Sequence, residues 1–217
     1  MSSPVHAPPP VSIPAGAVRL EGMLELGPSH GGIVVFSHGS GSGRLSPRNQ
    51  FVAAELRRAG LGTLLVDLLT PEEDADYENR FDIALLTERL GHAVRYVAGR
   101  NERRTPSVGL FGASTGAASA LRLAAAEPQL VRAVVSRGGR PDLAGAGVLG
   151  KVTAPTLLIV GGDDTGVIEL NRNAHDRLAH CERKLVLVPG ATHLFEEPGT
   201  LEKVARLASD WFARFLR

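Results

Sequence analysis

The stretch that decides the fold of this chain reads Ser107-Val108-Gly109-Leu110-Phe111-Gly112-Ala113-Ser114-Thr115-Gly116-Ala117-Ala118. Its apolar run predicts a buried strand, and Gly112-x-Ser114-x-Gly116 then leads into an alanine-rich helix. Such a turn is tight and strained, and it holds the serine hydroxyl out at the end of the sheet. The pattern therefore predicts that Ser114 is a nucleophile. The alternative is a turn of small residues that only packs a helix on a sheet, because three fixed residues in five also occur by chance.

Buried strands and helices alternate along the rest of the chain. Continuous apolar runs predict strands at residues 31–36, 62–69, 107–113, 131–136, 155–160 and 184–188. Helical spacing of apolar residues predicts helices over residues 47–59, 81–97, 115–127, 168–179 and 201–215. Alternation over residues 11–26 predicts antiparallel edge strands. Together these patterns predict an α/β fold with a mostly parallel sheet and helices on both faces, whose ligands bind beyond the carboxyl ends of the strands.

The composition is that of an ordinary globular chain, with 217 residues, 43% of them hydrophobic and 22% charged. We predict a flexible proline-rich tail at residues 1–14 and a single α/β domain at residues 15–217, without a separate cap domain. The formal net charge of +1 gives no reason to expect a nucleic acid or an anionic membrane as partner.

Several features of the sequence favour a cytoplasmic protein. No apolar stretch approaches the roughly 20 residues that span a bilayer, and the N-terminus lacks the pattern of a secretory signal. The only cysteine, Cys181, cannot form an intrachain disulfide, which fits a reducing compartment. We expect a small-molecule substrate and no nucleic acid or membrane partner, and we leave a homodimer open.

The residue types that nucleophilic chemistry needs follow predicted strands. A serine hydroxyl needs a base, and the base needs a carboxylate that orients it and stabilises its protonated form. His193, in a loop after the last predicted strand, is the candidate base, although a lone histidine there would be interpreted as a surface residue. The adjacent Asp163 and Asp164 compete for the role of the carboxylate, because neighbouring side chains of an extended segment point in opposite directions.

An oxyanion hole completes this chemistry, because attack on a carbonyl carbon places negative charge on the carbonyl oxygen. We expect the N–H of Thr115, directly after Ser114, to be one donor. The N–H of Ser40, in the glycine-rich loop after the strand at residues 31–36, is the expected second donor. A phosphate-binding loop is the competing interpretation, and the lack of a Gly-Lys-Ser/Thr ending argues against it.

From about residue 15 to its end, the chain resembles the α/β hydrolases of the compact dienelactone-hydrolase-like branch. The resemblance rests on the segments His38-Gly39-Ser40-Gly41, Gly112-Ala113-Ser114-Thr115-Gly116, Gly161-Gly162-Asp163-Asp164 and Gly190-Ala191-Thr192-His193. It implies an α/β-hydrolase fold and a catalytic triad of Ser114, Asp164 and His193, since Asp164 stands at the acid position of the family pattern.

The same resemblance implies a serine hydrolase that cleaves a small ester, lactone or thioester through an acyl-enzyme, with no cofactor and no metal. Dienelactone hydrolases proper carry a cysteine where this chain has Ser114, which favours general ester or thioester chemistry over the dienelactone reaction. Two alternatives remain: a non-catalytic member of the fold that binds a small ligand, and a cofactor-free haloperoxidase or acyltransferase on the same scaffold.

Arginines in two loops at the same predicted edge are candidates for contact with an anionic substrate. Arg44 and Arg137 are the candidates because the guanidinium fork fits a carboxylate or phosphate, and Arg48 and Arg140 lie in the same loops. The alternative is that these arginines pair with the acidic run at residues 72–76, which we interpret as a solvated loop. A glycine pattern at residues 145–150 matches a dinucleotide motif but follows no strand, so we interpret it as a loop.

Overall fold

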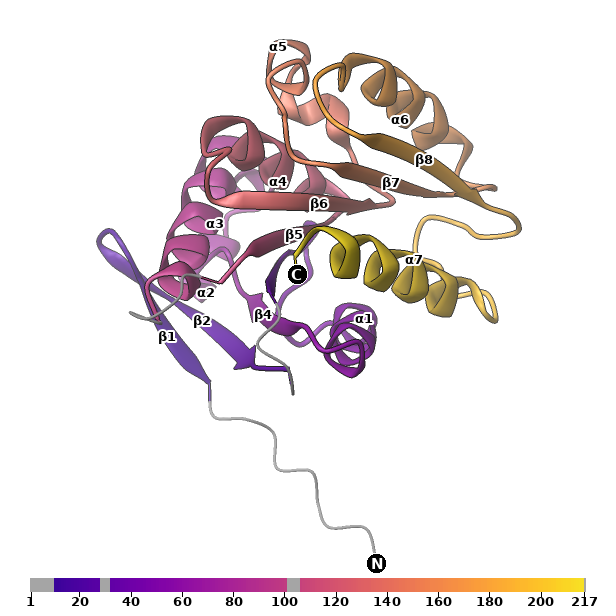
Figure 1. Ribbon diagram of the computed structural model, residues 1–217. Helices are drawn as coiled ribbons and strands as arrows, with labels where there is room; N and C mark the ends of the chain where they lie inside the picture. The colour runs from indigo at the N-terminus through magenta and orange to yellow at the C-terminus, as the bar shows by residue number, and fades with distance from the viewer. Residues whose placement is uncertain (1–9, 28–31, 101–105, 217) are drawn as a thin grey trace, which may run out of the picture.

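The computed structural model describes residues 10–27, 32–100 and 106–216, and its centre is one eight-stranded sheet (Figure 1). The strands lie in the order β1-β2-β4-β3-β5-β6-β7-β8. β1 pairs antiparallel with β2, β2 pairs antiparallel with β4, and the remaining pairs are parallel. Their bounds are β1 Val11–Ala15, β2 Val18–Glu25, β3 Ile33–Ser37, β4 Gly62–Val66, β5 Val108–Ala113, β6 Val131–Arg137, β7 Thr156–Gly161 and β8 Arg183–Val188. The predicted mostly parallel sheet with antiparallel edge strands is confirmed.

The central strands are apolar throughout because helices cover both faces of the sheet. Every residue of β3, β4, β5 and β7 is buried. Neighbouring residues of β5 alternate between two hydrophobic clusters, so that Leu110 belongs to one and Phe111 to the other. Phe111 packs against Phe36 of β3, with ring centres 4.9 Å apart.

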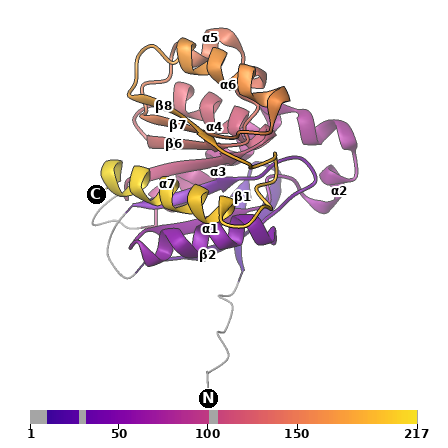
Figure 2. The same cartoon turned by 90° about the vertical axis from the view of Figure 1, so that its right-hand side faces the viewer.

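The helices divide between the two faces. Figure 2 shows α1 and α7 on one side of the sheet and α4, α5 and α6 on the other. Of the longer helices, α3 packs against α4, and α1 packs against α7. Their bounds are α1 Pro47–Arg58, α3 Ile83–Ala98, α4 Thr115–Ala126, α6 Thr165–Arg177 and α7 Thr200–Phe215. No helix in the described ranges is long and apolar enough to cross a membrane.

Three segments differ from the sequence-based expectations. Residues 11–14 belong to β1, where Ile13 is fully buried, so the domain begins before residue 15; residues 1–9 of the predicted tail lie outside the described residues. The acidic run is not a plain loop, because Pro71–Asp74 forms α2, capped by Thr70 and followed by the 3₁₀ helix Tyr77–Phe81. The glycine pattern at residues 145–150 contains the one-turn helix α5, Ala146–Leu149, after a second 3₁₀ helix, Pro141–Ala144.

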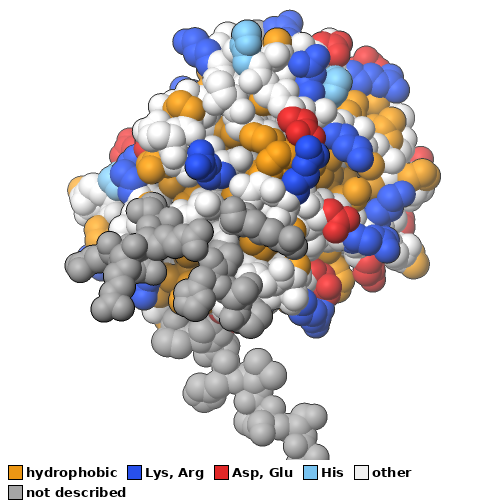
Figure 3. All heavy atoms as spheres, in the orientation of Figure 1, with side chains coloured by type: hydrophobic (Ala, Val, Ile, Leu, Met, Phe, Trp, Pro, Cys, Tyr) orange, Lys and Arg blue, Asp and Glu red, His pale blue; other side chains and the backbone are white. Residues whose placement is uncertain are grey.

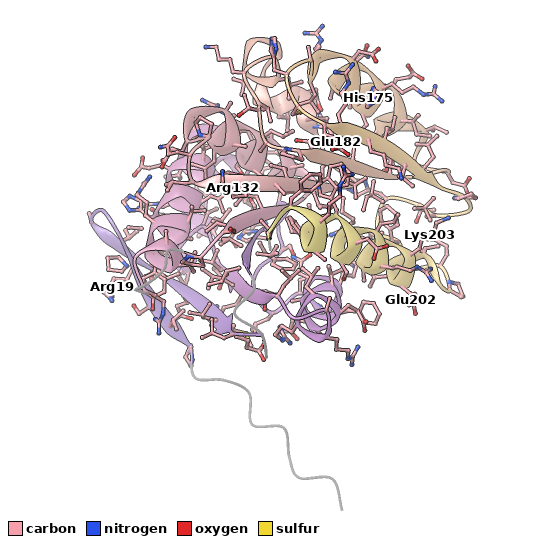
Figure 4. The ribbon with its side chains drawn as sticks, in the orientation of Figure 1. Arg19, Arg132, His175, Glu182, Glu202 and Lys203 are labelled. Carbon is pink, nitrogen blue, oxygen red and sulfur yellow. The ribbon has the colours of Figure 1, made fainter. Side chains whose placement is uncertain are left out.

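The parallel strands all point to one end of the molecule, where the loops after them meet. α7 begins at this end: Figure 4 shows Glu202 and Lys203 on its first turn, pointing outward. On the described part of the face drawn in Figure 3, acidic and basic side chains are interspersed. The polar residues singled out in the sequence follow the carboxyl ends of β3, β5, β6, β7 and β8, so the fold gathers them at one edge.

Candidate active site

Ser114 occupies a strained turn between β5 and α4. Its backbone angles are φ 50° and ψ −120°, and residues other than glycine rarely adopt such a positive φ. Such strain costs of order 1–3 kcal/mol and persists only where the surroundings hold it. Here the Ser114 N–H donates to the Arg137 carbonyl at 3.2 Å, and the Ser114 carbonyl accepts from the N–H of Arg140 at 3.0 Å. The turn is therefore held on both sides by the end of β6 and the segment that follows it.

The two glycines of this motif stand where backbone segments cross. A Cβ added at Gly112 would lie 2.6 Å from the Cα of Ala117, and one added at Gly116 would lie 2.2 Å from the carbonyl oxygen of Ser37. Both distances are too short for a side chain to fit without moving the backbone. The small residues around Ser114 are thus required by the close contact of β5, α4 and the end of β3.

His193 and Asp164 are hydrogen-bonded across the ends of β7 and β8. The Nδ1 of His193 lies 2.7 Å from Oδ2 of Asp164, whose side chain is 13% exposed, against 38% for His193. The N–H of Asp163 is bonded to the carbonyl of Ala191, and the Asp164 carboxylate, not that of Asp163, reaches the ring. A proton on Nδ1 that is donated to Asp164 leaves Nε2 of His193 free to accept one.

The loop that carries His193 packs against β6 and β7. A Cβ added at Gly138 would lie 3.1 Å from the His193 carbonyl oxygen and 3.4 Å from its Nδ1, and a Cβ at Gly161 would lie 2.3 Å from the Ala191 carbonyl oxygen. Phe195, two residues further, is buried with φ 57°. The carbonyl of Arg137 accepts the N–H of Ser114, and the next residue, Gly138, lies against His193. Two successive residues therefore connect the Ser114 turn with the His193 loop.

The loop after β3 lies directly against Ser114. A Cβ added at Gly39 would lie 3.0 Å from the Cβ of Ser114 and 3.8 Å from its Oγ. The N–H of Ser40, expected as an oxyanion donor, already has an acceptor in this structure, because it donates to Oγ1 of Thr115 at 3.0 Å. The structure thus brings Ser40 and Thr115 together beside Ser114, with the two residues bonded to each other.

His38 fixes this loop; it is part of the segment His38-Gly39-Ser40-Gly41, but the sequence alone assigns it no role. Its Nε2 accepts the N–H of Leu68 at 3.0 Å, and its Nδ1 lies 3.0 Å from the carbonyl of Gly39. Burial lowers the pKa of His38 below its ordinary value, against the opposite influence of the Gly39 carbonyl, Asp67 and Asp74. His38 is therefore neutral, with its proton on Nδ1. Its position directly after a buried strand and before Gly39 was the available signal.

Two hollows adjoin the loop. One, lined by Gly39, Ser40, Thr115 and Arg80 among others, is too narrow to hold a water molecule. The second, of about 250 Å³, is next to it, and its lining includes Arg44. Arg80, which the sequence analysis did not select, donates to the carboxylate of Asp74 at 2.9 Å across the first hollow.

The four candidate arginines have separate environments. Arg44 forms ion pairs with Asp67 and Glu21, Arg48 with Glu196, and Arg140 with Asp142. The expected alternative, pairing with the acidic run, is wrong: Glu73 pairs with Arg89 and Asp74 with Arg80.

Arg137 differs from these arginines. Its side chain is buried, with the residue 6% exposed, and its guanidinium lies 5.9 Å from the ring centre of Phe195. Among the described residues it has no carboxylate partner. Desolvation by burial, together with the charge of Arg48, lowers the pKa of Arg137 to about 10.

The described residues hold no group of three His, Cys, Asp or Glu side chains that could bind a metal ion. Cys181 lies away from this edge, before β8, and burial raises the pKa of its thiol. The groups available for chemistry at this edge are therefore a serine hydroxyl, an imidazole bonded to a carboxylate, and backbone and hydroxyl donors.

Comparisons with known proteins bear on the family and the fold of this chain. Residues 28–217 match the protein-family model described as the dienelactone hydrolase family. The crystal structure of a dienelactone hydrolase from Anabaena variabilis is 51% identical, covers 98% of this chain and 100% of its own, and superposes with a TM-score of 0.91. Est1E from Butyrivibrio proteoclasticus, at 18% identity, shares the fold over 94% of this chain and 98% of its own, with a TM-score of 0.79.

A curated relative from Mycobacterium tuberculosis strain H37Rv carries a different name. It is called a "putative phosphoribosyl transferase", and it is 57% identical over 204 residues. The match covers 93% of this chain and 45% of the relative, so the chain spans about half the length of that protein.

Proposed function

This chain belongs to the dienelactone hydrolase family, and we propose that it is a hydrolase that cleaves a small ester, lactone or thioester through an acyl-enzyme on Ser114. The observation that carries the proposal is the 2.7 Å bond between His193 and Asp164, at the sheet edge where Ser114 occupies its strained turn. No cofactor is required, since each step uses a group already at this edge.

In the first half of the reaction, Nε2 of His193 takes the proton of the Ser114 hydroxyl while Oγ attacks the carbonyl carbon. The carbonyl electron pair moves to oxygen, and donors from Thr115 and the Ser40 loop stabilise the charge. Collapse of the tetrahedral intermediate breaks the bond to the leaving group, which takes the proton from His193. Water, deprotonated by His193, then attacks the acyl-enzyme and regenerates the Ser114 hydroxyl. Asp164 orients the imidazole and stabilises its charged form throughout.

Arg137 is our candidate for contact with a negatively charged part of the substrate. It is the last residue of β6, next to the Ser114 turn, and it lacks a carboxylate partner among the described residues. Arg44 is a weaker candidate, because Asp67 and Glu21 already neutralise it. The negative charge of an anionic ester would pair with the positively charged Arg137 guanidinium.

The name of the Mycobacterium tuberculosis relative raises phosphoribosyl transfer as a second candidate. We do not favour it for this chain, because the chemistry available around Ser114 is that of acyl transfer. Incubation with phosphoribosyl pyrophosphate and nucleobases should release no pyrophosphate. A cytoplasmic location also belongs to this proposal, since the single cysteine fits a reducing compartment.

The decisive experiment is Ser114→Ala, with Ser42→Ala as the matched control in the loop after β3. We expect a fluorophosphonate probe to label the parent and the control but not Ser114→Ala. Hydrolysis of p-nitrophenyl acetate should fall to the weak level that binding and the oxyanion hole provide. Equal labelling and turnover in Ser114→Ala would exclude the acyl-enzyme. Added alcohols or peroxide, with product analysis, distinguish hydrolysis from acyl transfer and haloperoxidase chemistry.

A further inference from the structure

The hydrogen bond from Ser40 to Thr115 changes which group can donate a hydrogen bond to the oxyanion. A backbone amide has one proton, and that of Ser40 is donated to Oγ1 of Thr115 at 3.0 Å. While this bond persists, the Ser40 N–H does not point directly at a substrate carbonyl. The polar group at the other end of this bond is the hydroxyl of Thr115, the residue directly after Ser114.

The peptide that joins Gly39 and Ser40 is fixed at both ends. Its carbonyl accepts the N–H of Ser42 at 3.1 Å and lies 3.0 Å from Nδ1 of His38. His38 is itself held by the N–H of Leu68. Turning the Ser40 N–H away from Thr115 would rotate the whole peptide plane and break the bonds at its carbonyl end.

The Thr115 hydroxyl has a proton to offer. A hydroxyl carries one donor and two acceptor sites, and one acceptor site of Thr115 takes the Ser40 N–H. In the described part of the chain, this hydroxyl donates no hydrogen bond to another residue. The residue is 3% exposed, and it lines the narrow hollow beside Gly39 and Ser40.

From this geometry we infer that the Thr115 hydroxyl is a catalytic donor of the oxyanion hole, and that the Ser40 N–H acts through it. This inference rests on the proposed acyl-enzyme mechanism. When Oγ of Ser114 bonds to the carbonyl carbon, the new oxyanion accepts two hydrogen bonds from the same residue, one from the N–H and one from Oγ1 of Thr115. The Ser40 N–H, donated to Oγ1, polarises the hydroxyl and makes it a stronger donor.

The test compares Thr115→Val, which keeps the shape but removes the hydroxyl, with Thr115→Ser, which restores it. We expect Thr115→Val to lower kcat for p-nitrophenyl acetate by about 10²- to 10³-fold, as does the loss of one oxyanion donor elsewhere, with little change in KM. Thr115→Ser should stay within about fivefold of the parent. Thr115→Ala serves the same purpose if valine disturbs folding, as judged by thermal unfolding.

A second measurement separates a donor from a merely structural residue. A trifluoromethyl ketone forms a hemiketal oxyanion on the nucleophile, whereas the matched methyl ketone binds without forming a stable one. Loss of the hydroxyl should weaken the trifluoromethyl ketone about 10²-fold or more and leave the methyl ketone unchanged. Equal weakening of both would overturn the inference.

The outcomes also distinguish this inference from the mechanism on which it rests. Parental or faster turnover in Thr115→Val would overturn the inference alone, because it would mean that the Ser40 N–H, once released, is the direct donor. Turnover in the parent that does not depend on Ser114 would overturn the acyl-enzyme and the inference together.

Discussion

Keeping the charged guanidinium of Arg137 buried lowers the stability of the folded protein by an amount that can be measured. Burial is the main reason that the pKa of Arg137 falls to about 10, and the charge of Arg48 adds to it. Each pKa unit corresponds to 1.36 kcal/mol, so the charged form is about 3 kcal/mol less favourable in the folded than in the unfolded chain. The Phe195 ring, 5.9 Å away, returns about 0.5–2 kcal/mol of this. The net cost is about 1–3 kcal/mol.

The perturbation that tests this reasoning is Arg137→Met, which removes the charge and keeps a long unbranched side chain. At pH 7 the arginine is protonated in both states, so the full cost is present and its removal should raise the free energy of unfolding by about 1–3 kcal/mol. In a domain of this size, each kcal/mol corresponds to about 2–4 °C in Tm. Above about pH 10 the folded parent can release the proton, and the difference should shrink.

Urea unfolding at pH 7 measures the effect, with Arg44→Met as the control. Arg44 is ion-paired with Asp67 and Glu21, so its loss should leave stability unchanged or lower it by up to about 1 kcal/mol. A loss of more than about 1 kcal/mol in Arg137→Met would refute the reasoning and make the guanidinium a structural element.

The same variant tests the role of Arg137 in substrate binding. Its KM should rise about tenfold or more for an ester that carries a carboxylate, while a neutral ester of similar size changes little. Equal effects on both esters would mean that Arg137 only supports its loop. A gain in stability together with a loss in affinity is the pattern expected of a residue kept for function.

Two further predictions follow from the hydrogen bonds at this edge. Asp164→Asn should lower kcat by about 10³- to 10⁴-fold by leaving His193 in the wrong tautomer, whereas Asp163→Asn should be mild; the reverse ranking in steady-state assays would assign the acid to Asp163. Because burial lowers the pKa of His38, below about pH 6.5 the unfolded chain binds a proton there that the folded chain does not. The free energy of unfolding should therefore fall with pH in this range, by up to about 1.4 kcal/mol per pH unit. Urea midpoints at pH 5 and 7 should therefore differ less in His38→Gln than in the parent, and an unchanged difference would assign the acid sensitivity to other groups.

The sequence predicts the centre of this fold well because the requirements there are local. The glycines around Ser114 are needed within one turn, where β5 meets α4 and the end of β3, and the motif states them directly. The strand and helix spans follow from burial patterns of a few residues. The choice of Asp164 over Asp163 rests instead on the resemblance to the family pattern, because alternation along the backbone leaves both carboxylates open.

The arginine partners could not be predicted in the same way. Arg44 forms ion pairs with Glu21, on β2, and with Asp67, directly after β4. These two strands are neighbours only because of the strand order in the sheet. The bond between Ser40 and Thr115 likewise joins residues far apart in the chain. The short helix α2 is a different case, since the signal was present: Thr70, a proline and Glu73 form a capping box.

The end of α7 has a consequence for attaching this protein to something else. Leu216 packs against Gly32 and Gly109, beside the first residues of β3 and β5. The chain therefore leaves the fold where these strands begin, at the edge opposite the carboxyl end of β5 that leads into Ser114. Figure 1 shows the C-terminal end of α7 beside the sheet. A resin, a fluorescent tag or another domain joined after this point starts from the far side of the sheet. Immobilisation through the C-terminus should therefore leave the mouth of the site facing the solution, open to ligands that diffuse toward it.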